Sequence, residues 1–210
     1  MAVKHTELHA EQVRRWPTSG RHILAQFDDD EVIVYQAYRP SIGHYAAKHG
    51  HFGGPDFSFS RMSWIKPNFL WMMYRCGWAS KPGQEVVLAL HLRRAVFDQI
   101  LAAAVPSTYW PDRFEDEAAW KAAGKSTDVR LQWDPDHDPH GAPQDRRAIQ
   151  LGLRGATLAG FKGPSLLGVD DVTDFVVEQR TNVGSPSLRT PSEQVYPVAN
   201  EAVRKALRLD

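Results

Sequence analysis

The alternation of apolar and polar positions predicts strands that are separated by turns and helices. Residues 22–27 and 31–38 are rich in Val, Ile and Tyr, and three aspartates lie between them, so we expect a hairpin. Residues 85–92 are nearly all apolar, which is typical of a central strand covered on both faces. Further extended segments are expected at 57–65, 129–133 and 146–153.

Helices are predicted where apolar residues recur at helical spacing between end signals. Pro40 opens a helix that Gly50 ends, and Pro67 opens a second helix. The second helix has a core stripe of Phe69, Met72, Met73 and Cys76. Its other stripe, Asn68, Trp71, Arg75 and Trp78, is either an edge of the core or a wall of a binding cleft. Other helices are expected at 7–16, 97–104 and 115–123, in a turn at 157–161, and after Pro197, whereas 170–179 suits either a strand or a helix.

Two regions lack a regular pattern. Residues 134–141 hold two prolines, which disfavour a strand ladder and predict a loop, and residues 180–192 resemble a linker. Strands and helices do not alternate in a βαβ rhythm. The pattern therefore predicts an α+β fold, a mainly antiparallel sheet with flanking helices. We expect one globular domain over 1–180, with 181–210 forming a linker and a C-terminal helix that packs on it.

Composition narrows the classes of function. Lys plus Arg and Asp plus Glu both number 25, so the net charge gives no bulk attraction to nucleic acid or membrane. Cys76 is the only cysteine, which excludes a disulfide within the chain. The apolar runs are too short to span a bilayer, and the polar start of the chain lacks an apolar secretory segment. The expectation is a cytoplasmic protein with no membrane contact.

The strongest chemical signal is a set of cations among large aromatic residues between Val34 and Trp78. Arginine and lysine bind phosphate, and Tyr or Trp faces can stack on a base. Two of the cations directly precede a proline-opened helix, where an anion could also meet a helix N-terminus. The pattern predicts a site for a phosphorylated ligand, either a small molecule or a nucleic acid. The candidate ligand-binding residues are Tyr35, Tyr38, Arg39, Arg61, Ser63, Lys66, Trp71 and Arg75.

The same cations have a structural interpretation, in which they pair with Asp56, Glu85 or Asp134 to bridge elements. If the site is catalytic, His44 and Asp134 are the candidates for proton transfer near neutral pH. The polar segment around Asp134 also has metal-ligand residue types. Pro139 stands where a calcium loop needs glycine, so we expect a polar loop rather than a metal centre.

Five segments together resemble the family known as domain of unknown function 4291. They are YQAYRPSIG, FSFSRMSWIKPNFLWMMYRCGW, QEVVLALHLRR, VRLQWDPDHDP and RRAIQLGLRG. The resemblance covers roughly Arg21 to Arg180, and its most specific block is Arg61 to Pro67. It implies a family but no activity.

The order of these segments is also similar to ADP-ribosyltransferase-like domains. Those domains bind NAD in a cleft between small sheets, with a basic or His residue on the first strand and an acidic residue on a late strand. The resemblance implies that Arg39 holds a phosphate or ribose and that Tyr35 or Tyr38 stacks on nicotinamide. The late strand here offers Gln150 instead of an acid, unless Asp134 or Glu178 takes that role. The alternative is a non-catalytic module that binds RNA or single-stranded DNA.

Overall fold

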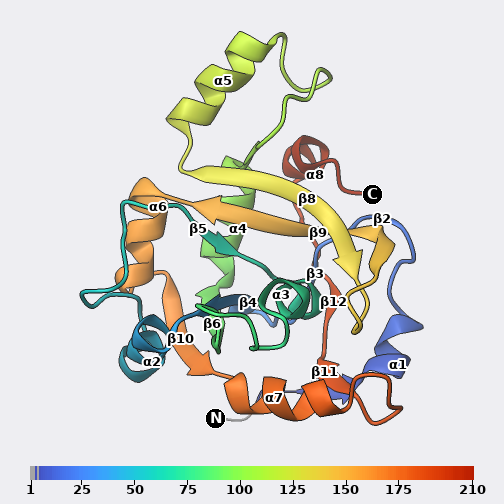
Figure 1. Ribbon diagram of the computed structural model, residues 1–210. Coiled ribbons are helices and arrows are strands. Elements are labelled where there is room, and N and C mark those ends of the chain that lie inside the picture. The colour runs from blue at the N-terminus through green and yellow to red at the C-terminus, as the bar shows by residue number, and fades with distance from the viewer. Residues whose placement is uncertain (1–2, 4) are drawn as a thin grey trace.

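Two sheets form the centre of the molecule. The computed structural model describes residue 3 and residues 5–210 (Figure 1). The first sheet is antiparallel and three-stranded, in the order β10 (Leu166–Asp171), β6 (Val86–Arg93) and β4 (Glu31–Tyr38). Strand β6 is buried along nearly its whole length, which its apolar sequence predicted.

The second sheet is mixed and curved. Its order is β2 (Gly20–Arg21), β9 (Pro143–Leu153), β8 (Val129–His137) and β7 (Val105–Pro106), and β5 (Ser63–Ile65) also pairs with β9. The long β8 and β9 pair is antiparallel, whereas β2 and β7 join in parallel. The fold is therefore α+β and mostly antiparallel, as the sequence pattern predicted.

The two sheets meet at one isolated bridge between β4 and the end of β5. The amide of Tyr35 donates to the carbonyl of Lys66 at 2.7 Å, and the amide of Lys66 donates back at 3.2 Å. Beyond this point the strands separate, because β4 continues along β6 while β5 continues along β9.

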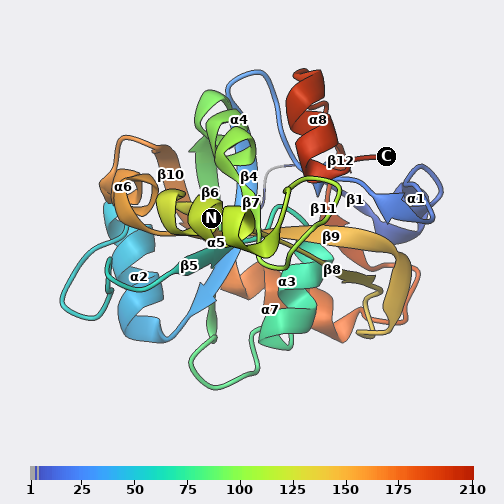
Figure 2. The ribbon, with the colours of Figure 1, turned by 90° about the horizontal axis from the view of Figure 1, so that it is seen from above.

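Helices cover both sheets and set the layers. Helix α2 (Pro40–His49) packs on β10 and β6, and α3 (Phe69–Cys76) packs between β4 and β8. Figure 2 shows α4 (Arg94–Ala103) beside α8 (Glu201–Leu207) at one side of the molecule. Helix α5 (Glu117–Ser126) stands away from the body in Figure 1. The remaining helices are α1 (His9–Val13), α6 (Gly155–Ala159) with the single turn η1 (Gly160–Lys162), and α7 (Thr173–Thr181).

The core divides into two clusters because β4 and β6 expose alternate side chains to opposite faces. Val32, Val34 and Leu90 belong to the cluster that reaches the second sheet. Ile33 and Tyr35 belong to the other, together with the predicted core stripe of α3. That stripe is confirmed, since Phe69, Met72, Met73 and Cys76 are all buried.

Several predicted boundaries are wrong. The predicted hairpin of residues 22–27 with β4 is present only next to the turn, where Phe27 and Val32 form an antiparallel bridge. Farther from the turn, β3 (Leu24–Ala25) pairs instead with β12 (Gln194–Val195). Strand β8 runs through Pro135 to His137, because a bulge after Pro135 accommodates the irregular pairing. Residues 180–192 include β11 (Arg189–Pro191), which pairs with β1 (Thr6–Leu8), the segment that was expected to begin a helix. The ambiguous segment 170–179 holds both the end of β10 and most of α7.

Among the helices of the described residues, none has the length and apolar character needed to cross a lipid bilayer.

Candidate functional site

A cleft opens where the two sheets separate. Its volume is about 660 Å³, and its walls come from the ends of β4 and β5, from α3, and from the facing strands β8 and β9. A second hollow of about 340 Å³ adjoins it and shares Tyr38, Arg61 and Ser63 as lining residues. We call these the central cleft and the side pocket.

A hydrogen-bonded trio of neutral residues lies where β4 faces β5. Gln36 Nε2 donates to Ser63 Oγ at 2.7 Å and to the carbonyl of Trp64 at 3.0 Å. The hydroxyls of Ser63 and Tyr38 share a 2.7 Å hydrogen bond, and burial raises the pKa of Tyr38 to about 12, so the phenol stays protonated. Gln36 Oε1 is buried and has no partner among the described residues, which leaves an unused acceptor at the cleft wall.

Lys66 brings an amine to the same cleft. The residue is 5% exposed, and its Nζ lies 5.2 Å from the ring centroid of Trp71. Its side chain makes no hydrogen bond or ion pair with any described residue. Burial, together with the nearby positive charge of Arg75, lowers the pKa of Lys66 to about 8, although the charge of Asp134 partly opposes the shift.

Asp134 is held by two glutamines across the β8 and β9 ladder. Gln132 Nε2 donates to its Oδ1 at 2.9 Å, and Gln150 Nε2 donates to its Oδ2 at 2.6 Å. Gln132 and Gln150 are direct partners in the ladder, and both line the central cleft. Amide donors on both carboxylate oxygens fix the position of Asp134.

Two arginines line the central cleft, and a third lines the side pocket. Arg61 is exposed and forms no side-chain hydrogen bond or ion pair within the described chain. Arg75 is exposed and donates to Gln84 at 3.2 Å, and Arg39 in the side pocket donates to Asp56 at 3.0 Å. The structural interpretation therefore holds for Arg39 alone among the predicted cations.

The N-terminus of α3 is not available to an external anion. Asn68 Oδ1 accepts from the amide of Trp71 at 2.7 Å, and Glu193 Oε1 accepts from the amide of Phe69 at 2.6 Å. Burial raises the pKa of Glu193 to about 8. The expectation of an anion at this helix entrance is wrong, because a carboxyl group from the far end of the chain fills the position.

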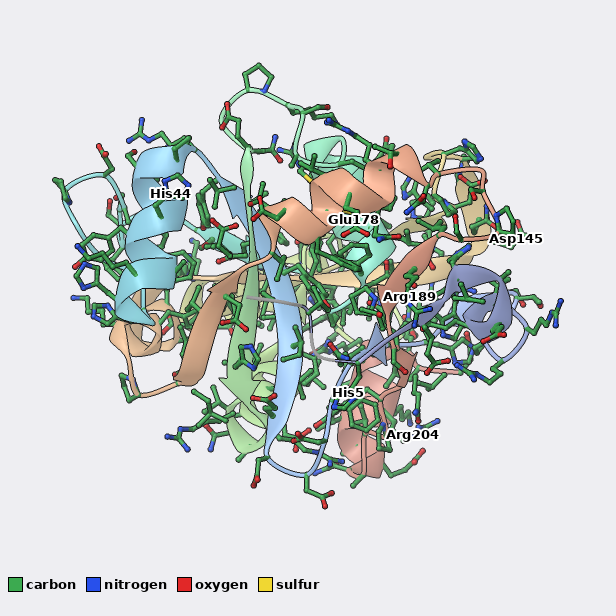
Figure 3. The ribbon with its side chains drawn as sticks, turned by 90° about the horizontal axis from the view of Figure 1, so that it is seen from below. His5, His44, Asp145, Glu178, Arg189 and Arg204 are labelled. Atoms are coloured by element: carbon green, nitrogen blue, oxygen red, sulfur yellow. The ribbon has the colours of Figure 1, made fainter. Side chains whose placement is uncertain are left out.

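The structure separates the remaining candidates. Tyr35 is fully buried and its ring packs against Phe69 at 5.4 Å, on the face of β4 away from the cleft. Trp71 is buried beneath Lys66, and its Nε1 finds no partner in the described chain. His44 projects from α2 toward Asp171 at 3.8 Å, and Figure 3 places it and Glu178 on separate elements. Neither residue lines the central cleft.

The segment after Asp134 has its own interactions. Arg146 donates two hydrogen bonds to Asp136 Oδ2, at 2.8 and 2.6 Å, and both residues are buried. The ring of His137 stacks on Tyr74 with centroids 3.6 Å apart. Among the described residues, no group of three or more His, Cys, Asp or Glu side chains has the geometry of a metal centre.

Gln36 and Gln132 were not predicted as site residues. Gln36 carried a usable signal, because it is a neutral polar residue inside the apolar strand EVIVYQAY, where it must be buried and hydrogen-bonded. No sequence signal pointed to Gln132, because its place in the cleft depends on its position opposite Gln150 in the ladder.

Comparison with known families extends the resemblance seen in the sequence. The sequence profile of one family matches residues 22–200, beyond the Arg180 limit inferred from the motifs. A comparison with curated proteins finds no match. Because the profile matches most of the chain, including every residue that lines the central cleft, the chain belongs to the family described as domain of unknown function DUF4291.

Proposed function

We propose that the central cleft binds a phosphorylated ligand of the nucleotide class and that the protein acts on this ligand as an enzyme. The observation that carries the proposal is the presence of two cations, Arg61 and Lys66, in one cleft without an acidic side chain bonded to either of them in the described chain. An unpaired cation at a concave site favours an anionic ligand. A buried lysine with a lowered pKa is also typical of catalytic sites.

The arrangement of the sheets supports the likeness to ADP-ribosyltransferase-like domains. Two small sheets meet at a single bridge, and the cleft lies at their junction. Strand β4 would be the first strand of such a domain and β9 the late one. Here these strands present Gln36 and Gln150 to the cleft, in place of a basic or His residue and an acid.

NAD is a ligand that the side chains present can accommodate. The unpartnered Oε1 of Gln36 can accept a hydrogen bond from a carboxamide N–H, and Arg61 and Arg75 can bind a pyrophosphate. Asp134 remains the acidic candidate near the cleft, although both its oxygens are bonded to amides. These two glutamine positions favour a reaction other than ordinary ADP-ribosyl transfer.

The alternative of a nucleic-acid-binding module has less support. Stacking on unpaired bases requires exposed aromatic faces. Tyr35 is fully buried and Trp71 is 6% exposed. Tyr74 is 44% exposed, but its ring is stacked on His137. A compact cleft with buried aromatic residues fits a small ligand better than a strand of nucleic acid.

Thermal-shift measurements with NAD, ADP-ribose and mononucleotides test the proposal. Binding to the folded state raises the melting temperature, and we expect at least one of these ligands to do so. Arg61→Ala should remove the shift, whereas Arg14→Ala, which changes an exposed arginine on another surface, should retain it. The absence of a shift with every phosphorylated ligand would refute the proposal, and binding to oligonucleotides alone would favour the alternative.

A further inference from the structure

The amine of Lys66 is placed to react as well as to bind. Its main chain is fixed on both sides, because the N–H and carbonyl bond to Tyr35 and because Pro67 and the capping residue Asn68 follow directly. Its side chain extends over the ring of Trp71 and ends at the central cleft. A lysine at a flexible surface would not have this fixed direction.

Two surroundings keep part of this amine neutral. Lys66 is almost completely buried, with 5% of its surface exposed. The positive charge of Arg75 lies nearby. Burial and a neighbouring cation are the two conditions that activate a lysine as a nucleophile. Asp134, the acid with an opposing effect, has each of its oxygens bonded to a glutamine amide and forms no ion pair with Lys66 in the described structure.

From this geometry we propose that Lys66 forms an imine with the carbonyl group of a phosphorylated aldehyde or ketone bound in the central cleft. The inference rests on the proposed function and names the substrate class of that site. Open-chain sugar phosphates, including the free ribose end of ADP-ribose, belong to this class.

The reaction is a condensation and needs no oxidant or reductant. The lone pair of Nζ attacks the carbonyl carbon, and the carbon–oxygen double bond opens to give a carbinolamine. Loss of water then forms the carbon–nitrogen double bond, and the water carries away the carbonyl oxygen with both amine protons. Arg61 and Arg75 at the opening are placed to hold the phosphate while the carbonyl group lies at Lys66.

Pyridoxal 5′-phosphate is a suitable probe, because it is a phosphorylated aldehyde. The protein is treated briefly at pH 7, the imine is reduced with borohydride, and the modified lysines are located by peptide mass spectrometry. Lys121 on α5 serves as the internal reference, since its side chain is 60% exposed. We expect Lys66 to be labelled on the order of tenfold faster than Lys121, since far more of a lysine with a lowered pKa is unprotonated at pH 7.

Further labelling experiments distinguish imine formation at Lys66 from phosphate binding in the cleft. Pyridoxal without phosphate should label Lys66 more slowly, and pyrophosphate should protect Lys66 from the phosphorylated probe. Arg61→Ala should remove the preference for the phosphorylated probe while Lys66 still reacts faster than Lys121. Lys66→Arg should abolish the dominant adduct, and the comparison with Lys121 in the unmodified sequence holds even where this variant folds poorly.

Labelling of Lys66 at the rate of Lys121 or slower would overturn the imine proposal, whatever the thermal shifts show. Equal labelling by pyridoxal and its phosphate, without protection by pyrophosphate, would overturn the phosphate site and the proposed substrate class.

Discussion

Tyr35 and Lys66 exchange two backbone hydrogen bonds, and this exchange is the point where the sheets join. The bridge sends the two side chains to different environments. Tyr35 is buried on one face of β4, whereas Lys66 reaches the central cleft. Both residues were predicted to bind the ligand, and of the two only Lys66 lines the central cleft.

The affinity for a phosphorylated ligand that has no free carbonyl group, such as a mononucleotide, should depend on the protonation of Lys66. Its pKa is lowered to about 8 by burial, and an amine is charged below its pKa. Affinity should therefore be highest below pH 8 and fall by roughly tenfold as the pH rises toward 10, which corresponds to the loss of about one charge-assisted contact. Isothermal titration calorimetry over this range measures the change.

Lys66→Arg provides the control for that pH dependence. A guanidinium stays charged throughout the range, and Glu193, whose pKa is also near 8, is unchanged in the variant. A variant with the same fall in affinity as the original protein would show that Lys66 is not the titrating group.

Gln150→Glu should destabilise the protein rather than restore a missing catalytic acid. The change removes the 2.6 Å hydrogen bond to Asp134 and places a second carboxylate beside it. Like charges at this distance raise the pKa of one carboxyl, so the repulsion is relieved at pH 5. We expect a loss of roughly 1–3 kcal/mol in the free energy of unfolding at pH 7 and a smaller loss at pH 5.

Urea unfolding at both pH values checks this prediction. Gln144→Glu, at an exposed position of the same strand, is the matched control and should cost little. Similar losses in the free energy of unfolding for both variants would show that the hydrogen bond between Gln150 and Asp134 does not contribute specifically to stability.

Glu193 should make the stability of the protein decrease as the pH rises. Burial raises its pKa from an ordinary value of 4.5 to about 8, so between these values the folded protein holds a proton that the unfolded chain releases. The stabilising contribution is complete below pH 4.5 and is lost as the pH rises through 8. Glu193→Gln keeps an acceptor for the amide of Phe69 and removes this dependence.

Unfolding free energies measured between pH 5 and pH 8 test the effect. The original protein should lose on the order of 2–4 kcal/mol more than Glu193→Gln over this interval. Glu201→Gln, at an exposed position on α8, should behave like the original protein. Parallel curves for all three proteins would contradict the account of Glu193.

Arg146→Ala should strongly destabilise the fold. The guanidinium donates twice to buried Asp136, donates to the carbonyl of Pro17 at 2.6 Å, and lies 5.2 Å from the ring centroid of Trp16. Its removal leaves an uncompensated buried carboxylate, which typically costs about 3–5 kcal/mol. Thermal unfolding should show a much smaller effect for Arg147→Ala, and equal effects would refute the importance of the buried pair.

The sequence predicted those parts of the fold that depend on neighbouring residues. Helix α2 begins after Arg39 and ends at Gly50, where a positive φ of 70° favours glycine. The core stripe of α3 follows from helical spacing alone. In contrast, β2 pairs with residues 146–147 and β3 pairs with residues 194–195, and no local pattern indicates such distant partners.

The sequence likewise predicted the parts of the candidate site that come from one short segment, but not the contacts between distant segments. The cations Arg61, Lys66 and Arg75 do reach one cleft, because Arg61 and Lys66 flank β5 and Arg75 lies on α3, which follows β5 closely in the chain. The closure of the α3 N-terminus by Glu193 joins residues 124 positions apart and could not be foreseen from spacing. The pairing of Gln132 with Gln150 likewise depends on the register of β8 and β9.

The central claim is that the cleft binds a phosphorylated ligand through its unpaired cations. Calorimetric titration of ADP-ribose at pH 7 into the original protein, Arg61→Ala and Arg14→Ala tests it most directly. We predict saturable binding by the original protein and by Arg14→Ala, with affinity at least about tenfold lower for Arg61→Ala. Absence of binding by the original protein, or equal weakening by the two substitutions, would contradict the claim.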